Sequence, residues 1–229
     1  MLRRFLVAAG VVSSVAFAAQ AVGAQSMSSP MMSHPAFGVM GGLNLASMGG
    51  SDASGLDSRV GFLVGGFAKF QITPKIAIQP ELFYTQKGAK QNMDDGNGGT
   101  ITAHIKPSYV ELPVLVRMNF SMAPDAGARP FILLGPTFAL KAGCQFSASD
   151  AGASVSESCG DAAAQSAQSG ENVDAKSFDM GALAGAGIDL RAGGHTMSLG
   201  LRYDYGFTGI FDGSNMKNRA LSFVVGFGF

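Results

Sequence analysis

Apolar and polar side chains alternate with a period of two along three segments of the chain. Between residues 76 and 87 the even positions are mainly apolar, whereas the odd positions include Glu81 and Lys87. Residues 109–120 and 197–208 show the same alternation. Because successive side chains of a strand point to opposite faces, each segment is predicted to be a strand with one apolar and one polar face. Their length of ten or more residues suits a tilted membrane-spanning strand better than the roughly five or six residues usual in soluble sheets.

Five further segments fit the same interpretation with less contrast between the two faces. Residues 37–45, 60–72 and 178–191 are rich in glycine on the face predicted to point inward, where a narrow barrel has little room. Residues 130–141 are nearly all apolar, and residues 219–229 alternate clearly. Eight strands result, an even number as in bacterial outer-membrane barrels. The predicted fold class is therefore all-β: an eight-stranded antiparallel up-and-down transmembrane β-barrel.

The connections between the predicted strands alternate in length. Those at 73–75 and 192–194 are tight and the one at 121–129 is moderate, whereas the others are mostly longer and more polar. The longer connections are 47–58, 89–100, 142–176 and 211–216. Outer-membrane barrels have short periplasmic turns and longer extracellular loops, so both ends of the barrel sequence are expected on the periplasmic side. Within the long extracellular loop 142–176, residues 147–170 are mostly Ala, Ser, Gly and Gln and are expected to be flexible.

The N-terminal segment has the parts of a secretory signal peptide. Two basic residues, Arg3 and Arg4, precede an apolar stretch that ends at small residues up to Ala24. A retained membrane anchor is the alternative, but the apolar stretch is shorter than the ~20 residues that a spanning helix needs. We therefore expect a signal peptide at 1–24 with cleavage near Ala24, a flexible N-terminal segment at 25–35, and the barrel at 36–229.

Composition and charge narrow the class further. The chain is 47% hydrophobic and only 14% charged, yet no stretch after the signal peptide reaches the ~18 consecutive apolar residues of a membrane helix. A closed barrel is the other structure that satisfies every backbone group in lipid. Removing Arg3 and Arg4 from the 16 basic residues leaves 14 against 16 acidic ones, a net charge near −2. A nucleic-acid partner is not expected, because phosphate binding needs a basic face.

Several runs of the sequence also carry a family resemblance. They read GGLN at 41–44, IQPELFYTQKG at 78–88, YVELPVL at 109–115, and YDYGFT at 203–208 followed by KNR at 217–219. In these runs the chain resembles the PorT-like outer-membrane β-barrel proteins, often labelled porin-family. The resemblance covers nearly the whole predicted mature chain, although segment 142–176 is longer than the family's loops. It implies a barrel in the bacterial outer membrane, and says little about function.

The last predicted strand resembles a further signal. Its apolar face ends in the aromatic-rich alternation that the barrel-assembly machinery reads, carried here by Phe223, Val225, Phe227 and Phe229. The predicted partners are therefore outer-membrane lipid and, during biogenesis, that machinery. An extracellular or envelope partner of the loops stays open, because the sequence identifies none.

Charged and amide side chains of the predicted strands fall on the inward face. They are Lys69, Gln79, Glu81, Lys87, Glu111, Arg117, Asp179, Asp189, Arg202 and Asp204. Charges of both signs would pair there, and the interior of an eight-stranded barrel is just wide enough for side chains to fill. This favours a structural or interaction-type barrel with a plugged lumen. Two alternatives stay open: porin-like passage of small solutes, and an adhesin or secretion accessory acting through the extracellular loops.

The two cysteines, Cys144 and Cys159, lie in one predicted extracellular loop. In an oxidising compartment they are expected to form a disulfide that closes a loop of about 15 residues, worth roughly 3 kcal/mol by the chain-entropy estimate. Free thiols are the alternative. A zinc site is disfavoured because it needs four ligands and no histidine lies nearby.

No catalytic, cofactor or metal site is expected. A barrel hydrolase needs a nucleophile beside an oriented base. The predicted mature chain has only His34, His104 and His195, and none is expected near both a serine and an acid. His195 and Ser198 are closest in sequence, but their opposite parity places them on different faces of the strand. The sequence therefore predicts a protein that is not an enzyme.

Overall fold

The computed structural model describes residues 35–94, 99–120, 127–150, 153–159, 176–192, 194–210 and 215–229. They belong to one compact unit, Met32–Phe229. The predicted signal peptide, and the predicted flexible segment except its last residue, lie outside the described residues. Among the described residues, no helix has the length and apolar character needed to cross a membrane.

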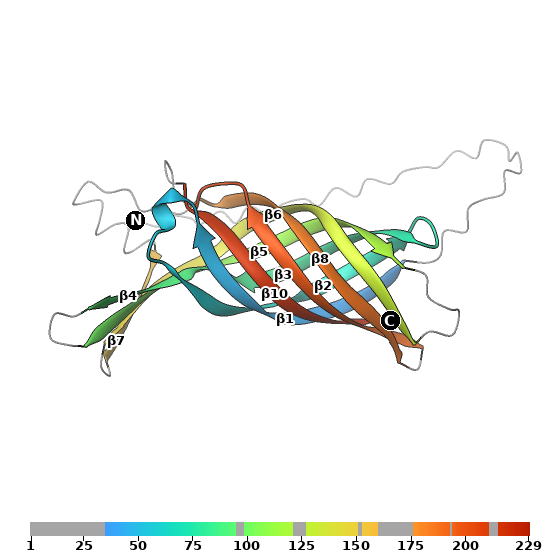
Figure 1. Ribbon diagram of the computed structural model, residues 1–229, viewed down its shortest axis with the longest axis horizontal. Helices are drawn as coiled ribbons and strands as arrows, with labels where there is room; N and C mark the ends of the chain where they lie inside the picture. Colours follow the sequence, from blue (N-terminus) through green and yellow to red (C-terminus); the bar gives the residue numbers. More distant parts are fainter. Residues whose placement is uncertain are drawn as a thin grey trace, which may run out of the picture. The chain divides into compact units, whose positions relative to one another are not determined.

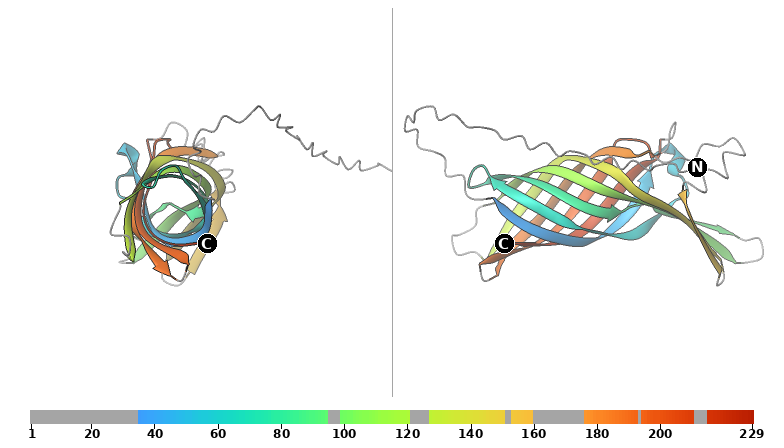
Figure 2. Two further views of the ribbon diagram at one scale, coloured as in Figure 1. Left: turned by 90° about the vertical axis from the view of Figure 1, so that its right-hand side faces the viewer. Right: turned by 180° about the vertical axis from the view of Figure 1, so that it is seen from behind.

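Eight antiparallel strands form a closed ring (Figure 2, left). They are β1 (Ala36–Gly49), β2 (Asp57–Gln71), β3 (Ile76–Gln86), β5 (Thr100–Asn119), β6 (Ala128–Asp150), β8 (Phe178–Ala192), β9 (His195–Gly206) and β10 (Lys217–Gly228). Each pairs with the next, and β1 pairs with β10 from Gly38↔Gly228 to Gly49↔Lys217. Closure leaves no open edge in the ring, as a sheet in lipid requires. The predicted fold class is confirmed.

Strand β5 shows most clearly how the sequence divides the two faces of the wall. Its even positions from Val110 to Met118 are apolar and exposed on the outside, and its odd positions are buried in the lumen. From Val110 to Phe120 the strand advances about 34 Å, or about 25 Å along the barrel axis at a tilt near 40°. That height matches the apolar band of outer-membrane barrels. Beyond Val110 the outward positions become polar, beginning with Ser108 and Lys106.

Glycines on the inner face leave room for larger side chains opposite. A Cβ at Gly38 would lie 2.3 Å from the ring of Phe67, which belongs to the neighbouring strand β2. Any larger residue at this position would force the ring aside. The glycine-rich inner faces expected from the sequence therefore alternate with bulky residues that fill the lumen.

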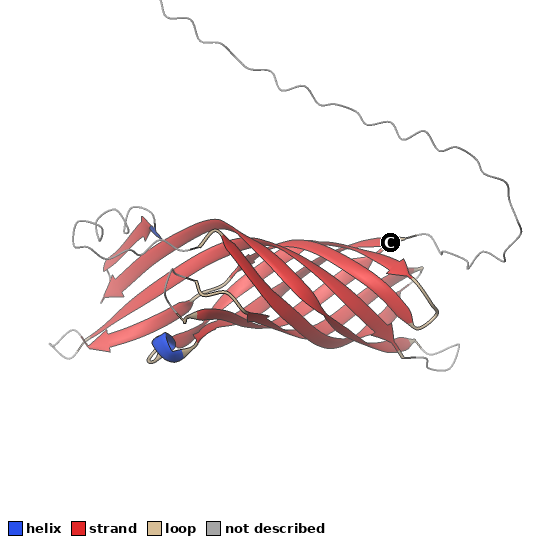
Figure 3. Cartoon of the chain, turned by 90° about the horizontal axis from the view of Figure 1, so that it is seen from above, coloured by secondary structure: helices blue, strands red, loops and turns tan. Residues whose placement is uncertain are grey.

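Two strands that the sequence did not predict extend the wall at one end (Figure 1). They are β4 (Ala89–Asp94), which pairs with β5, and β7 (Ala153–Ser158), which pairs with the end of β6. We call β4, β7, residues 100–106 of β5 and residues 143–150 of β6 the arm. This end is the arm end, and the opposite end, where β1 starts and β10 finishes, is the turn end (Figure 3).

The arm corrects the expected loops at 89–100 and 142–176. Within those ranges, residues 89–94, 142–150 and 153–158 are strands, so these parts are not the loops that were expected. Alanine is depleted in strands and serine favours turns, so these segments carry little strand signal in the sequence. Pairing with neighbouring strands supplies the backbone hydrogen bonds, and Phe146 and Val155 share one face of this extension through the register of β6 with β7.

The two ends of the ring are closed differently. At the turn end, β2 and β3 join through residues 72–75, where the Thr73 backbone N–H donates to the Ile76 carbonyl at 3.0 Å. At the arm end, the short helix η1 (Ser51–Ala53) follows β1. Met48, Ala89 and Ile210 form a buried apolar cluster there, against which Leu56 and Ile105 pack.

Candidate functional site

The lumen holds a continuous series of buried polar side chains. Nine of the ten inward positions expected from the sequence are buried: Gln79, Glu81, Lys87, Glu111, Arg117, Asp179, Asp189, Arg202 and Asp204. Lys69, the tenth, is only partly buried. The nine buried residues come from β3, β5, β8 and β9 and from the β3–β4 connection, which holds Lys87. The ring geometry thus brings together charges that are up to 121 positions apart in the sequence, as with Glu81 and Arg202.

Arg117 organises the half of the lumen nearer the turn end. Its Nη2 lies 2.5 Å from Asp189 Oδ2, and its Nη1 donates to Gln79 Oε1 at 3.1 Å. The guanidinium also stacks 3.5 Å from the centre of the Phe131 ring. The hydroxyl of Ser198 donates to the other oxygen of Asp189 at 2.6 Å. Asp189 therefore has both carboxylate oxygens satisfied.

Gln79 connects this group to a second ion pair. Its Nε2 donates to Glu81 Oε1 at 2.7 Å, while Arg202 Nη1 lies 2.5 Å from Glu81 Oε2. Glu81 is only 1% exposed, so this carboxylate depends on Gln79 and Arg202 for its solvation. The hydrogen-bonded series runs from Asp189 through Arg117, Gln79 and Glu81 to Arg202.

Lys87 is the single cation of a third group, nearer the arm end. Its Nζ lies 2.6 Å from Glu111 Oε1 and 2.7 Å from Asp204 Oδ2. All three side chains are at most 8% exposed. The ammonium lies between two carboxylates, and Asp204 Oδ1 has no hydrogen-bond partner among the described residues. The Lys87 ammonium is thus the charge that offsets both buried acids, and losing it would leave them uncompensated.

The structure adds a polar group that sequence reasoning missed. Asn218 Nδ2 donates to Tyr109 Oη at 3.1 Å and to Asp179 Oδ2 at 2.9 Å. The hydroxyl of Thr208 donates to the other oxygen of Asp179. Tyr109 could have been identified from the sequence, because it occupies an inward position of its predicted strand. Asn218 could not, because it lies just before the predicted strand 219–229.

Apolar clusters fill the lumen beside the charged groups. Met40, Leu63, Phe83 and Val224 form one cluster, against which Phe67 packs. A second cluster consists of Leu115, Phe131, Leu133 and Leu183. The sequence places these apolar residues at inward positions of their strands, but only polar residues were included in the expected set of lumen residues.

Little free volume remains between these groups. A cavity of about 20 Å³ lies beside Arg117 and Arg202, and one of about 10 Å³ lies beside Lys87 and Glu111. A cavity needs roughly 10–15 Å³ to hold one water molecule. A larger pocket of about 150 Å³ opens at the turn end, outside the ion-paired series.

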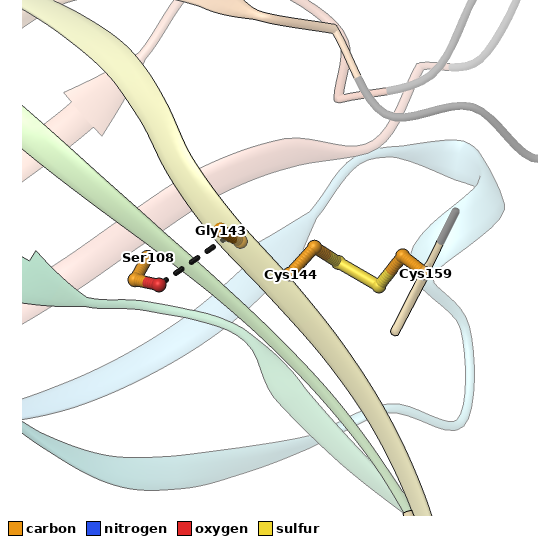
Figure 4. Close-up of a disulfide and its surroundings, with 4 residues drawn as sticks. All are labelled: Ser108, Gly143, Cys144 and Cys159. Atoms are coloured by element: carbon orange, nitrogen blue, oxygen red, sulfur yellow. Dashed lines mark hydrogen bonds between the residues drawn. A yellow bond between two sulfur atoms is a disulfide. The ribbon is translucent and has the colours of Figure 1, made fainter. Parts of the chain in front are cut away.

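A disulfide braces the base of the arm (Figure 4). Cys144 on β6 is bonded to Cys159, which directly follows β7, with a Cα–Cα distance of 5.3 Å. The expected pairing is thus present, and the structure contains no free cysteine. The bond joins the two strands of the β6–β7 hairpin, so it holds part of the segment that was expected to be a loop.

The described histidines lie apart from the lumen network. His195 faces outward and stacks on Phe227, with ring centroids 5.1 Å apart, whereas Ser198 faces inward and bonds to Asp189. His104 lies on the arm, and His34 lies outside the described residues. Within the part of the chain that the structure describes, no three His, Cys, Asp or Glu side chains are grouped to hold a metal ion.

The residues of the expected assembly signal lie on the lipid-facing side of β10. Phe223, Val225, Phe227 and Phe229 are between 40% and 65% exposed. Their recognition by the assembly machinery stays a prediction.

Comparison with known proteins places the chain in a family. The family described as outer membrane protein beta-barrel domain matches residues 22–212. No curated protein matches the chain. The finer resemblance to PorT-like proteins stays a prediction.

Several solved structures are similar at low identity. Neisserial surface protein A is 16% identical, with 84% of this chain and 97% of that chain covered and a TM-score of 0.43. Ail, the attachment invasion locus protein of Yersinia pestis, is 12% identical, with coverages of 85% and 98% and a TM-score of 0.40. The outer membrane enzyme PagL is 14% identical, with coverages of 84% and 97% and a TM-score of 0.42. None of these similarities carries a functional argument for this chain.

The family match spans most of the 229 residues, and the closed ring has an apolar outer band of membrane height. The chain therefore belongs to the outer membrane protein beta-barrel domain family and is a bacterial outer-membrane protein.

Proposed function

We propose that this protein is a non-conducting outer-membrane barrel of structural or interaction type, whose arm is the extracellular recognition element. The observation that supports this proposal is the filled lumen. The series from Asp189 to Arg202 crosses the middle of the barrel, and the Lys87 group lies above it. Apolar side chains occupy the remaining space.

A solute crossing this lumen would have to break several ion pairs at once. Each carboxylate freed from its cation would stay buried, at a cost of about 3–5 kcal/mol per broken pair. The free volumes of about 20 and 10 Å³ hold single waters rather than a continuous water path. Porin-like passage is therefore the weaker proposal.

The arm supplies the interaction surface in this proposal. Because outer-membrane barrels keep their short turns in the periplasm, the arm end is extracellular. Register places Met93 of β4, Phe146 of β6 and Val155 of β7 on the face that continues the barrel interior, and all three are exposed. The opposite face is polar, with Thr102, Ser147 and Ser156. Exposed apolar side chains that cluster on one face are typical of protein contact sites.

Planar-bilayer recording tests the closed lumen. The purified full chain is expected to give no stable conductance steps in symmetrical salt. Reproducible channels that disappear in the Glu111→Gln or Arg117→Gln variant would overturn the proposal in favour of porin-like passage. Turnover of lipid or peptide substrates would instead identify an enzyme, and the same preparation can be assayed for both.

Complementation tests the arm. In a deletion strain scored for envelope-stress response and uptake of an apolar dye, the Phe146→Ser/Val155→Ser variant is expected to complement poorly although it assembles normally. The matched control, Ser147→Ala/Ser156→Ala on the polar face of the same strands, is expected to complement fully. Equal complementation by both variants would remove the arm from the proposal.

A further inference from the structure

A pocket opens at the turn end of the barrel, outside the ion-paired series. Its volume is about 150 Å³, and residues of β1, β2, β9 and β10 line it together with Gly194 and Phe229. Lys69, Thr196 and Ser198 supply its polar side chains, and Phe67 closes its inner side toward the smaller cavity. A cavity of about this size holds a molecule of roughly six heavy atoms. The pocket is therefore large enough for a small organic or inorganic ion.

Lys69 has no counter-charge of its own in this pocket. Its side chain makes no hydrogen bond and no ion pair with any described residue. The charged groups within electrostatic reach are Arg117, Asp189 and Arg129. Asp189 is the only acid among them, and Arg117 and Ser198 already occupy its two oxygens. The ammonium of Lys69 is thus left with three N–H donors and no acceptor among the described side chains.

Two arginines lie at the turn-end termini of β6 and β8. Arg129 lies directly opposite Asp189 on the neighbouring strand, and Arg191 lies opposite Thr196. Neither arginine side chain pairs with an acid among the described residues. Among the described side chains, the charges within electrostatic reach of Lys69 are thus two cations, Arg117 and Arg129, and one carboxylate, Asp189. This local surplus of positive charge attracts an anion from solution.

We propose that the turn-end pocket binds a small anion through carboxylate or phosphate oxygens, with Lys69 Nζ and the Thr196 hydroxyl as donors. Ser198 contributes no donor, because its single O–H is given to Asp189. The ion-paired side chains of the lumen lie directly beyond the inner side of the pocket. The anion therefore enters and leaves by the periplasmic mouth and does not cross the membrane. The site goes beyond the proposed function, and its failure would leave the closed lumen unaffected.

The test uses the full chain refolded in detergent, with its lysines reductively dimethylated with ¹³C so that each keeps its charge and gives an NMR signal. Sodium phosphate, sodium acetate and glycerol 3-phosphate are titrated separately against sodium chloride at constant ionic strength. The Lys69 signal, assigned by its loss in Lys69→Gln, is expected to shift and saturate. Lys75, an exposed lysine in the β2–β3 turn at the same end, serves as the internal control and is expected to shift little.

Variants separate specific binding from general attraction. Arg129→Gln is expected to weaken phosphate binding severalfold, whereas Lys75→Gln leaves it unchanged. Lys69→Arg keeps the charge, so phosphate binding, detected by phosphorus line broadening, is expected to persist in this variant. In Lys69→Gln the affinity for phosphate is expected to fall at least tenfold. A tail-bearing phosphatidic acid that competes better than glycerol 3-phosphate would identify a lipid headgroup as the source, and equal competition would identify a soluble anion. Linear shifts of equal size at Lys69 and Lys75, or equal competition by chloride, would overturn the proposal.

Discussion

Replacing Lys87 by methionine tests the buried charge network most sharply. The substitution keeps an unbranched side chain one atom shorter than lysine and removes the ammonium that lies 2.6 Å from Glu111 and 2.7 Å from Asp204. Two carboxylates would then face each other in a buried site with room for about one water molecule. Breaking a buried pair costs about 3–5 kcal/mol, because the remaining charge is uncompensated. We expect the unfolding equilibrium constant to rise roughly 150- to 5,000-fold, since 1.36 kcal/mol corresponds to a factor of ten.

The assay is urea unfolding in lipid vesicles, followed by the gel mobility that distinguishes folded from heat-denatured barrel. The chain contains no tryptophan, so mobility and far-ultraviolet circular dichroism replace intrinsic tryptophan fluorescence. The variant Lys87→Met/Glu111→Gln/Asp204→Asn removes the carboxylates with the cation and is expected to recover most of the lost stability. Lys75→Met, in an exposed turn, is the matched control and should change stability by less than about 0.5 kcal/mol. A loss below about 1 kcal/mol in Lys87→Met, or no recovery in the triple variant, would refute the reasoning.

Three further predictions concern the apolar outer band of the barrel and the arm. Leu134→Arg places a charge on the lipid-facing side of β6 and is expected to lower the free energy of unfolding by about 2–4 kcal/mol in the same urea assay. Ser147→Arg on the arm should lower it hardly at all, and equal effects of the two variants would contradict the position of the apolar band. Cys144→Ser is expected to speed protease cleavage within the β6–β7 hairpin and to cost up to roughly 3 kcal/mol of stability; unaltered cleavage would contradict the bracing role of the disulfide. Burial, with the nearby Lys106, Arg59 and Lys90, lowers the pKa of His104, so Lys106→Gln should raise that pKa in an NMR titration; a fall would contradict the predicted sign.

The ring of eight strands was predictable because lipid and lumen impose opposite demands on alternate residues. Along β5, Val110 and Val116 face lipid while Glu111 and Arg117 face the lumen, and no helix or two-sided soluble strand gives that pattern. The signal was strong wherever inward residues were charged. The alternation was weaker in β1 and β2, where the inward positions 38, 42, 61 and 65 are glycine and have no side-chain polarity.

The arm and the exact pairings were not predictable from one sequence. Segment 147–158 is dominated by serine and alanine, whose local preference is for turns and helices, and its strands form through pairing that periodicity alone does not reveal. The partners of a lumen charge depend on the stagger of the ring. That stagger brings Lys87 to Asp204 and Arg202 to Glu81, across 117 and 121 positions of sequence, respectively.

Nitroxide scanning along residues 110–118 of β5 in lipid vesicles tests the central claim most directly. Spin labels placed one at a time report collisions with oxygen, which is enriched in lipid, and with a water-soluble nickel chelate. The account predicts high oxygen accessibility at every even position, low accessibility to both reagents at every odd position, and no odd position that the nickel chelate reaches freely. High nickel accessibility along the odd positions would reveal an open aqueous lumen, and loss of the alternation would contradict the membrane-embedded barrel itself.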